Sequence, residues 1–476
     1  MQLKIIFVFF SALCGLLWQA HSYAQTNIAS IDADASQAKK LIRRLDVQAA
    51  KSFPANGPGA VVLVMKGHQV LLRRAYGRAN IELGVIMKPE HRFHVASVGK
   101  QFTAAAILQL QEERKLKVED PIRQYFPDAP LSWDAIQIKH LLSHTSGIRN
   151  LFLNEAFRQG AYLPHTPQQL FELAIKEPTV GAAGHQFHYA TVNYTLLAMI
   201  IEKVSGQKYS DYIEQHLLRA AGMQDTIFDQ TQGLVKGVVS PYQNGPRLAE
   251  RFHPSVGFGG GSFYSTADDL AKWTFALHSA KLISLESLKL MQTRFVLDTG
   301  ASIPYGFGLR PHRLRQQVYL QSNGDIQGYH TETAYLPQSD IFVAVLSNGE
   351  SLPFGLQPLA KHLGMIVSDG DYKEPKPVHV DESVLQEWSG VYAAGNDAYQ
   401  VRYKDGKLWI ALPGEGKWNS LSPISTTEFF YDSNPDFRLR FSRDAEGHRH
   451  SQWFEFEALD DETDPVLDWQ GPVTNL

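Results

Sequence analysis

Two stretches with strand-like patterns lie far apart in the chain, and most of the sequence between them has helical spacing. The segment GAVVLVMKGHQVLLRRAYG (59–77) predicts two strands joined by a tight turn at Lys66-Gly67-His68. Two further strands are predicted over 329–337 and 340–348. The long middle, roughly 97–300, is mostly helical with long loops. Apolar residues recur with helical periodicity over 36–50, 98–115, 166–176, 192–205, 267–278, 284–292 and 355–367.

The order of these elements predicts the fold class. Strands lie at both ends of the region and helices lie between them, so the simplest closure is one antiparallel sheet built from both ends. The terminal helices would cover one face of this sheet, and the mostly helical middle would cover the other. We therefore predict an α/β (α+β) fold with an antiparallel sheet flanked by terminal helices and a helical subdomain.

The composition changes near residue 370. The segment SDGDYKEPKPVHV (368–380) is polar and contains two prolines, which predicts a linker over 371–380. Beyond it, YQVRYKDGKLWIAL (399–412) alternates around an Asp405-Gly406 turn, the pattern of a β-hairpin. A second pair of strands is predicted within 436–457. We expect one domain over 25–370 and a small antiparallel β domain over 381–476.

The first 24 residues have the features of a secretory signal peptide. Lys4 precedes an apolar run from Ile5 to Leu17, and Ser22 and Ala24 form a small-x-small cleavage site. The run is shorter than the ~20 apolar residues that a membrane-spanning helix needs, although an uncleaved anchor is the alternative. The prediction is secretion across the inner membrane into the periplasm.

Charge and cysteine content narrow the possible partners. Cleavage would remove one positive charge, that of Lys4, and take the formal net charge from -4 to -5. An acidic protein of this kind argues against a nucleic-acid partner. The only cysteine, Cys14, would leave with the signal peptide. The mature chain would then have no disulfide, no thiol nucleophile and no cysteine-ligated metal.

Ser97 and Lys100 lie three residues apart at the start of the helix predicted over 98–115. Residues at this spacing share one face of a helix, so the Lys100 amine would point back toward the Ser97 hydroxyl. A serine hydroxyl becomes a strong nucleophile when a base takes its proton, and a neutral lysine amine can be that base. The free backbone N–H of Ser97 could also stabilise an oxyanion.

The spacing alone is a weak signal, because Ser-x-x-Lys also occurs at 36–39 and 205–208. A serine at the start of a helix is also a common N-cap, which is the structural alternative. What distinguishes Ser97 is the run TAAAILQL (103–110) behind it, which is apolar and rich in small residues. This run is typical of a buried helix that presents its N-terminus to a cleft. The other two matches lack such a run.

Five ordered segments resemble the superfamily of serine β-lactamases and penicillin-binding proteins. The similarity is greatest to the branch with class C β-lactamases, D-Ala-D-Ala carboxypeptidases and related esterases. It covers about 36–368, and LQEWSGVYAAG (385–395) resembles the small β domain that often follows such enzymes. The five segments are FHVASVGKQFTAAAILQLQEERKLKVEDPIRQYFPDAP (93–130), IKHLLSHTSGI (138–148), FHYATVNYTLLAMIIEKVSG (187–206), GGGSFYSTADDLAKW (259–273) and GDIQGYHTETAYLPQSDIFVAVLSNG (324–349).

The resemblance implies three motifs around one active site. The first is Ser97-x-x-Lys100, and the second, usually Tyr-x-Asn, is Tyr189-x-Thr191 in this chain. By its family role, Tyr189 would move a proton between Ser97 and the leaving group. Thr191 can form hydrogen bonds but has no amide group, which counts against recognition of an amide-bearing substrate.

The third motif, usually Lys-Thr-Gly or His-x-Gly on an edge strand, aligns with Ser322-x-Gly324. Ser322 therefore holds the position of the usual cation or imidazole, and a substrate carboxylate would lose its positive partner. Asp325 follows, where the family's second oxyanion N–H would come from, and its carboxylate would further disfavour anionic substrates. These departures count against penicillins and D-Ala-D-Ala peptides and favour esters or neutral amides.

Other candidate sites carry weaker patterns. His140 and His144 have the spacing of zinc ligands but lack the glutamate of His-Glu-x-x-His. The segment GFGGGSF (257–263) lacks the Gly-Lys-Ser/Thr of a phosphate loop, and we expect it to let backbone pass close to the cleft. The aromatic residues of the tail could line a ligand groove, but filling a small core is the expected role. No metal and no cofactor is expected.

The sequence thus predicts an exported serine hydrolase that forms a Ser97 acyl-enzyme with an ester, amide or peptide substrate. Lys100 and Tyr189 would move the proton, and the backbone N–H groups of Ser97 and Asp325 would hold the oxyanion. The alternative is a catalytically weak or inactive binding or regulatory module on the same fold. A small-molecule or peptide substrate is the expected partner, and the oligomeric state stays open.

Overall fold

The computed structural model describes residues 36–229, 234–243, 245–349, 355–368, 375–394, 397–411, 418–432, 434–455 and 466–471. The predicted signal peptide, 1–24, lies outside these residues, and so does the first part of the predicted linker, 371–374. Within the described ranges, no helix combines the length and the apolar character that crossing a bilayer requires.

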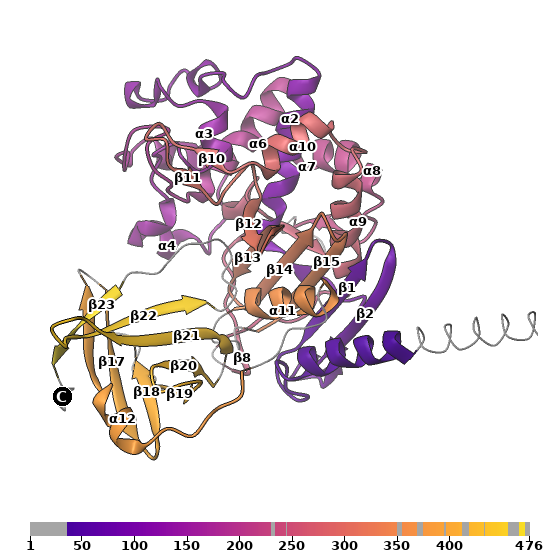
Figure 1. Cartoon of the computed structure of the whole chain (residues 1–476). Coiled ribbons are helices and arrows are strands. Elements are labelled where there is room, and N and C mark those ends of the chain that lie inside the picture. The colour runs from indigo at the N-terminus through magenta and orange to yellow at the C-terminus, as the bar shows by residue number, and fades with distance from the viewer. Residues whose placement is uncertain are drawn as a thin grey trace, which may run out of the picture.

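One antiparallel sheet of six strands organises the larger part of the molecule (Figure 1). Its order is β12-β13-β14-β15-β1-β2, so the first strand pairs with the last one, Ala60 opposite Ser347. This confirms the sheet predicted from both ends of the region. The strands are β1 (Ala60–Lys66), β2 (Gln69–Tyr76), β12 (Arg310–Leu314), β13 (Gln317–Ile326), β14 (Tyr329–Leu336) and β15 (Ile341–Ser347).

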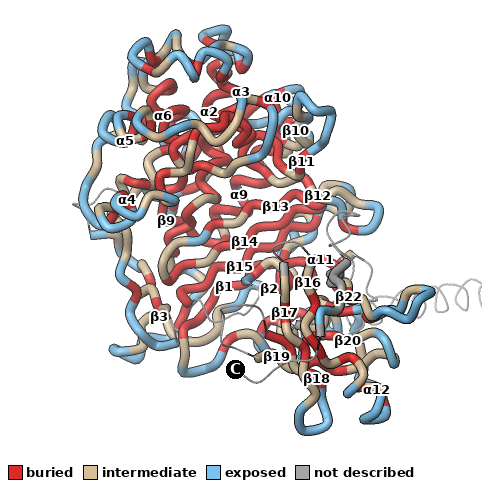
Figure 2. Tube along the Cα trace, turned by 90° about the vertical axis from the view of Figure 1, so that its left-hand side faces the viewer, coloured by how far each residue is buried: buried red, intermediate tan, exposed pale blue. Residues whose placement is uncertain are grey.

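Alternate residues of the strands serve two different cores. Val62 and Val64 of β1 pack with Leu45 of helix 36–50 and with Leu363 of α11 (Gln357–Ser368). Their neighbours face the other side, where Leu63 joins the large core of the helical region. Because successive strand residues point to opposite faces, a fully apolar strand such as β1 must be covered on both. Figure 2 shows β1, β14 and β15 as buried along most of their length.

The helical region covers the second face of the sheet. Its two most buried helices, α2 and α6, pack against each other. The helix predicted over 98–115 begins as a 3-10 turn, Ala96–Gly99, and continues as α2 only to Glu112. The helices are α2 (Lys100–Glu112), α3 (Ile138–Leu142), α4 (Glu155–Gly160), α5 (Pro167–Ala174), α6 (Thr191–Ser205), α7 (Tyr209–Tyr212), α8 (Arg219–Ala221), α9 (Ala267–His278) and α10 (Leu285–Gln292).

Short strands form four small sheets that are separate from the six-stranded sheet among the described residues. In the first group, β5 (Phe93–His94) and β6 (Ile227–Phe228) both pair with β9 (Phe263–Ser265), which brings the segment before Ser97 beside the glycine-rich loop. The remaining pairs are β3 (Arg78–Asn80) with β4 (Val85–Ile86), β7 (Tyr242–Gln243) with β8 (Arg247–Leu248), and β10 (Phe295–Val296) with β11 (Ser302–Ile303).

The C-terminal part is a closed antiparallel barrel that follows the short helix α12 (Glu382–Glu387). Asp405 and Gly406 form the turn between β17 and β18 with positive φ values of 52° and 77°, as the hairpin pattern predicts. Trp388 and Tyr392 are among the aromatic residues that fill its core. The strands are β16 (Gly390–Ala394), β17 (Asp397–Lys404), β18 (Lys407–Ala411), β19 (Asn419–Pro423), β20 (Glu428–Tyr431), β21 (Asn434–Arg443), β22 (Arg449–Glu455) and β23 (Val466–Gly471).

Candidate active site

The 3-10 turn that carries Ser97 is held against the glycine-rich loop. Ala96, directly before Ser97, has a positive φ of 43°, which is uncommon for a residue with a side chain. Its carbonyl oxygen lies against Gly261, where an added Cβ would come within 1.8 Å of that oxygen. The segment 257–263 therefore lets two backbones meet closely at the start of α2, as its glycines suggest.

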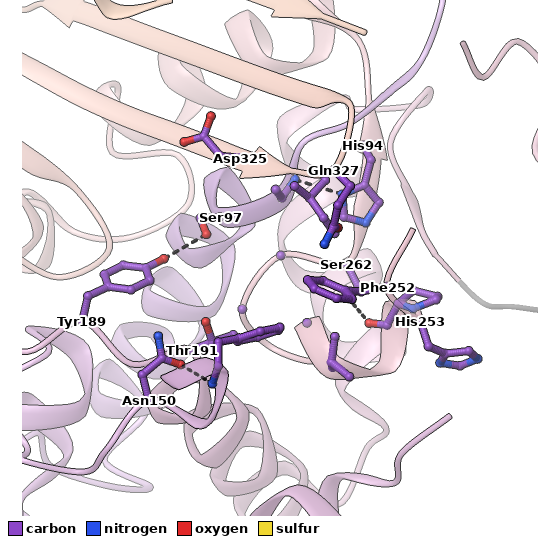
Figure 3. Close-up of a pocket in the computed structure, with 18 of the residues that line it drawn as sticks. His94, Ser97, Asn150, Tyr189, Thr191, Phe252, His253, Ser262, Asp325 and Gln327 are labelled. Atoms are coloured by element: carbon purple, nitrogen blue, oxygen red, sulfur yellow. Dashed lines mark hydrogen bonds between the residues drawn. The ribbon is translucent and has the colours of Figure 1, made fainter. Parts of the chain in front are cut away.

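Three polar side chains from distant parts of the chain meet at the Ser97 hydroxyl. The Lys100 amine, 1% exposed, donates to Ser97 Oγ over 3.0 Å and to the Gly260 carbonyl oxygen over 2.8 Å. The Tyr189 hydroxyl donates to the same Oγ over 2.8 Å, and Figure 3 shows its ring directed at Ser97. The Lys100 nitrogen also lies 5.0 Å from the centre of the Tyr189 ring. This arrangement can take a proton from a serine and return it to another group.

The other side of Ser97 is formed by the second half of β13. Strand β12 pairs with β13 only up to Gln321, so Ser322 to Ile326 pair with β14 alone and leave their other edge to the turn of Ser97. At Gly324 an added Cβ would lie 2.1 Å from the Val95 carbonyl oxygen and 3.0 Å from the Ser97 nitrogen. A glycine is therefore required for the strand to approach the nucleophile.

The structure places the remaining residues singled out from the sequence at different depths. Thr191, the first residue of α6, lines the pocket beside Tyr189. Ser322 is 6% exposed and lies outside the pocket lining, although strand alternation puts it on the same side as Gly324. Asp325 lines the pocket, but Figure 3 shows its carboxylate directed away from Ser97. That carboxylate accepts from Asn323 Nδ2 over 2.9 Å and lies 2.7 Å from His330 Nδ1.

A pocket of about 410 Å³ opens at Ser97 and extends toward the loop of His253 (Figure 3). Phe152 and Phe252 form part of its wall, with ring centres 5.3 Å apart. Among the described residues that line it, none is a lysine or arginine, and Asp325 is the one carboxylate. The pocket is therefore suited to a neutral, largely apolar group.

His94 is a pocket residue that the sequence analysis did not select, although it lies three residues before Ser97. Its Nδ1 accepts from the backbone N–H of Ala96 over 3.2 Å. Burial, aided by the charge of Arg251, lowers the pKa of His94 to about 3, so the ring is neutral at physiological pH. Phe152 and Phe252 were also missed, because no local pattern connects them to Ser97.

The two histidines with zinc-ligand spacing have separate partners. His140 Nδ1 accepts from the backbone N–H of Gln137, whereas His144 Nδ1 accepts from that of Ala190. Across the part of the chain that the structure describes, one group of three residues has the spacing of metal ligands. It includes neither His140 nor His144. It lies near the turn between β21 and β22 and consists of Asp444, Glu446 and His448.

Comparison with known proteins identifies the family. A family model described as Beta-lactamase matches residues 47–362. Penicillin-binding protein 4* of Bacillus subtilis (strain 168) is 27% identical over 394 residues, which is 78% of this chain and 87% of that protein.

Two solved structures share the fold. The octameric penicillin-binding protein homologue from Pyrococcus abyssi has a TM-score of 0.63 at 24% identity, covering 91% of this chain and all (100%) of that chain. A D-stereospecific amidohydrolase from Streptomyces sp. has a TM-score of 0.59 at 21% identity, covering 69% and 98%. Since the family model spans most of the sequence and the fold agrees, this chain belongs to the β-lactamase and penicillin-binding-protein superfamily of serine hydrolases.

Proposed function

We propose that this protein hydrolyses an ester, amide or peptide bond through an acyl-enzyme on Ser97. The observation that carries the proposal is the convergence of the Lys100 amine and the Tyr189 hydroxyl on Ser97 Oγ, at 3.0 and 2.8 Å. A serine that only caps a helix does not need a buried lysine and a tyrosine at its hydroxyl.

The reaction would run in two halves. Ser97 Oγ transfers its proton to the Lys100 amine, which must be unprotonated to act as this base, and attacks the substrate carbonyl carbon, while the backbone N–H groups of Ser97 and Asp325 stabilise the oxyanion. The leaving group departs with a proton delivered through Tyr189. A water molecule then attacks the acyl carbonyl and gives up its proton by the same route. The acid is released and Ser97 Oγ regains its hydrogen.

The walls of the pocket favour a neutral substrate. With no lysine or arginine in the described lining, a substrate carboxylate would have no positive partner, and the carboxylate of Asp325 would repel it. The phenylalanine wall would accommodate an apolar acyl group or leaving group. We therefore propose esters or neutral amides as substrates, ahead of penicillins. Export to the periplasm stays a prediction from the sequence of 1–24.

A binding or regulatory role on the same fold is the second candidate. It is favoured by Thr191 and Ser322, which replace two substrate-binding residues of the family pattern. A binding role, however, would not require the contacts of Lys100 and Tyr189 with Ser97, and so it leaves these two contacts unexplained.

Two reagents separate these functions. Wild type and Ser97→Ala are mixed with a p-nitrophenyl ester and, separately, with a fluorescent penicillin, and release of nitrophenol and labelling of the protein are followed. We expect Ser97-dependent ester turnover and little or no penicillin labelling. A stable penicillin adduct on Ser97 without ester turnover would favour the binding role. No Ser97-dependent reaction with either reagent would overturn the proposal.

A further inference from the structure

His144 lies directly beneath the ring of Tyr189. It is fully buried (0% exposed), and its ring centre is 4.1 Å from that of Tyr189, with 33° between the planes. The rings of Tyr194 and Tyr305 surround it at 5.2 and 5.0 Å. His144 also has a positive φ of 56°, a conformation that most side chains avoid. A strained, buried residue in contact with a reacting side chain points to a functional constraint.

His144 holds the backbone on both sides of Tyr189. Its carbonyl oxygen accepts from the N–H of His188 over 2.8 Å, and its Nδ1 accepts from the N–H of Ala190 over 3.3 Å. One histidine therefore contacts the residue before Tyr189, the residue after it and the phenol ring itself.

The hydrogen bonds also define the state of the imidazole. Ser146 Oγ donates to Asn193 Oδ1 over 2.9 Å, which turns the amide nitrogen of Asn193 toward His144 Nδ1 at 3.3 Å. Because Nδ1 faces two donors, the ring proton is on Nε2. Burial and the nearby charge of Lys100 lower the pKa of His144 well below its usual value, so the ring stays neutral. The ring therefore adds no positive charge of its own beside Lys100 Nζ.

We propose that His144 is a positioning residue that orients the Tyr189 hydroxyl between Ser97 and the leaving group. The inference rests on the proposed function, since it assigns His144 an action only through the proton transfer by Tyr189. General acid catalysis needs the donor within hydrogen-bond reach, and a tilt of the phenol would lengthen its 2.8 Å contact with Ser97 Oγ. His144 does not touch the substrate.

The test uses two esters with the same acyl group. A p-nitrophenolate leaves without a proton near neutral pH, whereas an ethoxide must be protonated as it leaves. In His144→Asn, we expect kcat/KM, which reports the acylation step, to fall about 10²-fold for the ethyl ester and less than about tenfold for the p-nitrophenyl ester. Asparagine tolerates a positive φ, so the local backbone is retained. Tyr189→Phe should show the same dependence on the leaving group.

A control variant and a substitute variant complete the test. His140→Asn makes the same change four residues earlier, at a buried histidine that bonds Gln137, and should leave the ratio of the two kcat/KM values unchanged. If His144→Asn does not fold, Ser146→Ala is used instead, because it removes the hydrogen bond that orients Asn193. We expect a smaller loss of activity than in His144→Asn, and again a larger loss for the ethyl ester than for the p-nitrophenyl ester. Equal losses for both esters in the His144 or Ser146 variant would overturn the inference alone. Absence of Ser97-dependent turnover in the wild type would overturn the proposed function and the inference with it.

Discussion

The two sides of the pocket at Ser97 are built in different ways. On the helix side, the Lys100 amine and the Tyr189 hydroxyl each donate a hydrogen bond to Ser97 Oγ, and Lys100 is also held by the Gly260 carbonyl oxygen. On the strand side, Gly324 contributes by having no side chain, and the carboxylate of Asp325 points away from the serine. The contribution of the helix side to the reaction at Ser97 therefore depends on which side chains are present. The contribution of the strand side depends on how closely its backbone approaches Ser97.

The largest expected effect belongs to the helix side. Replacement of Lys100 by methionine removes the base, and we expect ester turnover to fall about 10³-fold or more. The matched control is Lys208→Met in the Ser205-x-x-Lys208 match, where the lysine is exposed and lies between α6 and α7. Initial rates with a p-nitrophenyl ester measure both. Similar losses in the two variants would mean that Lys100 has no special role.

The strand side should tolerate new side chains except at Gly324. In Gly324→Ala, the added Cβ would meet the Val95 carbonyl oxygen and push β13 away from Ser97, so we expect kcat to fall about 10²-fold through loss of oxyanion stabilisation. Gly160→Ala is the control, because an added Cβ there meets nothing within 4 Å. An active Gly324→Ala enzyme would show that the close approach is not needed.

A smaller effect is expected from restoring a cation on the strand. Ser322→Lys would place an ammonium group on the side of β13 that faces Ser97, and one charged hydrogen bond is worth about 1.5 kcal/mol, or roughly tenfold in rate. We expect kcat/KM for a succinyl ester to rise about tenfold relative to that for a butyryl ester. The ratio of the two values is compared between variant and wild type. An unchanged ratio would contradict the view that Ser322 determines the preference for neutral substrates.

The smallest effect concerns stability, at Glu332 on β14, which pairs with Asn323 of β13. Burial raises the pKa of Glu332 well above its usual 4.5, so the folded state keeps a proton that the unfolded state loses. The stability linked to this group is therefore present below pH ~4.5 and is lost as the pH rises toward the folded pKa. Glu332→Gln should raise Tm relative to wild type at pH 8 and change it little at pH 4. A Tm difference that does not depend on pH would contradict this.

Much of the fold could be predicted because its strands have clear patterns. The apolar run of β1 and the turn before β2 predict their pairing, and α9 spans the predicted 267–278. Strands β12 and β13 were not found by periodicity. Gln321 and Ser322 are polar and adjacent, yet both are buried. Strand β13 therefore lacks the alternation of apolar and polar residues by which a strand is found in a sequence.

The candidate site was predictable only in part. Ser97 and Lys100 are close in sequence, and Tyr189 followed from the family resemblance. The contacts of Phe152, Phe252 and His144 form between segments that are far apart in the chain, and no local pattern reports them. The orientation of the Asp325 carboxylate depends on Asn323, two residues earlier on β13, and on His330, which lies opposite Asp325 once β13 pairs with β14.

The most direct test of the central claim is the mass of the protein during turnover. The wild type is mixed with an excess of a p-nitrophenyl ester, quenched in acid within the first turnovers and examined by intact and peptide mass spectrometry. We predict an added acyl group on the peptide that contains Ser97, absent from Ser97→Ala. Turnover of the ester with no adduct on Ser97, at the same rate in wild type and Ser97→Ala, would contradict the account.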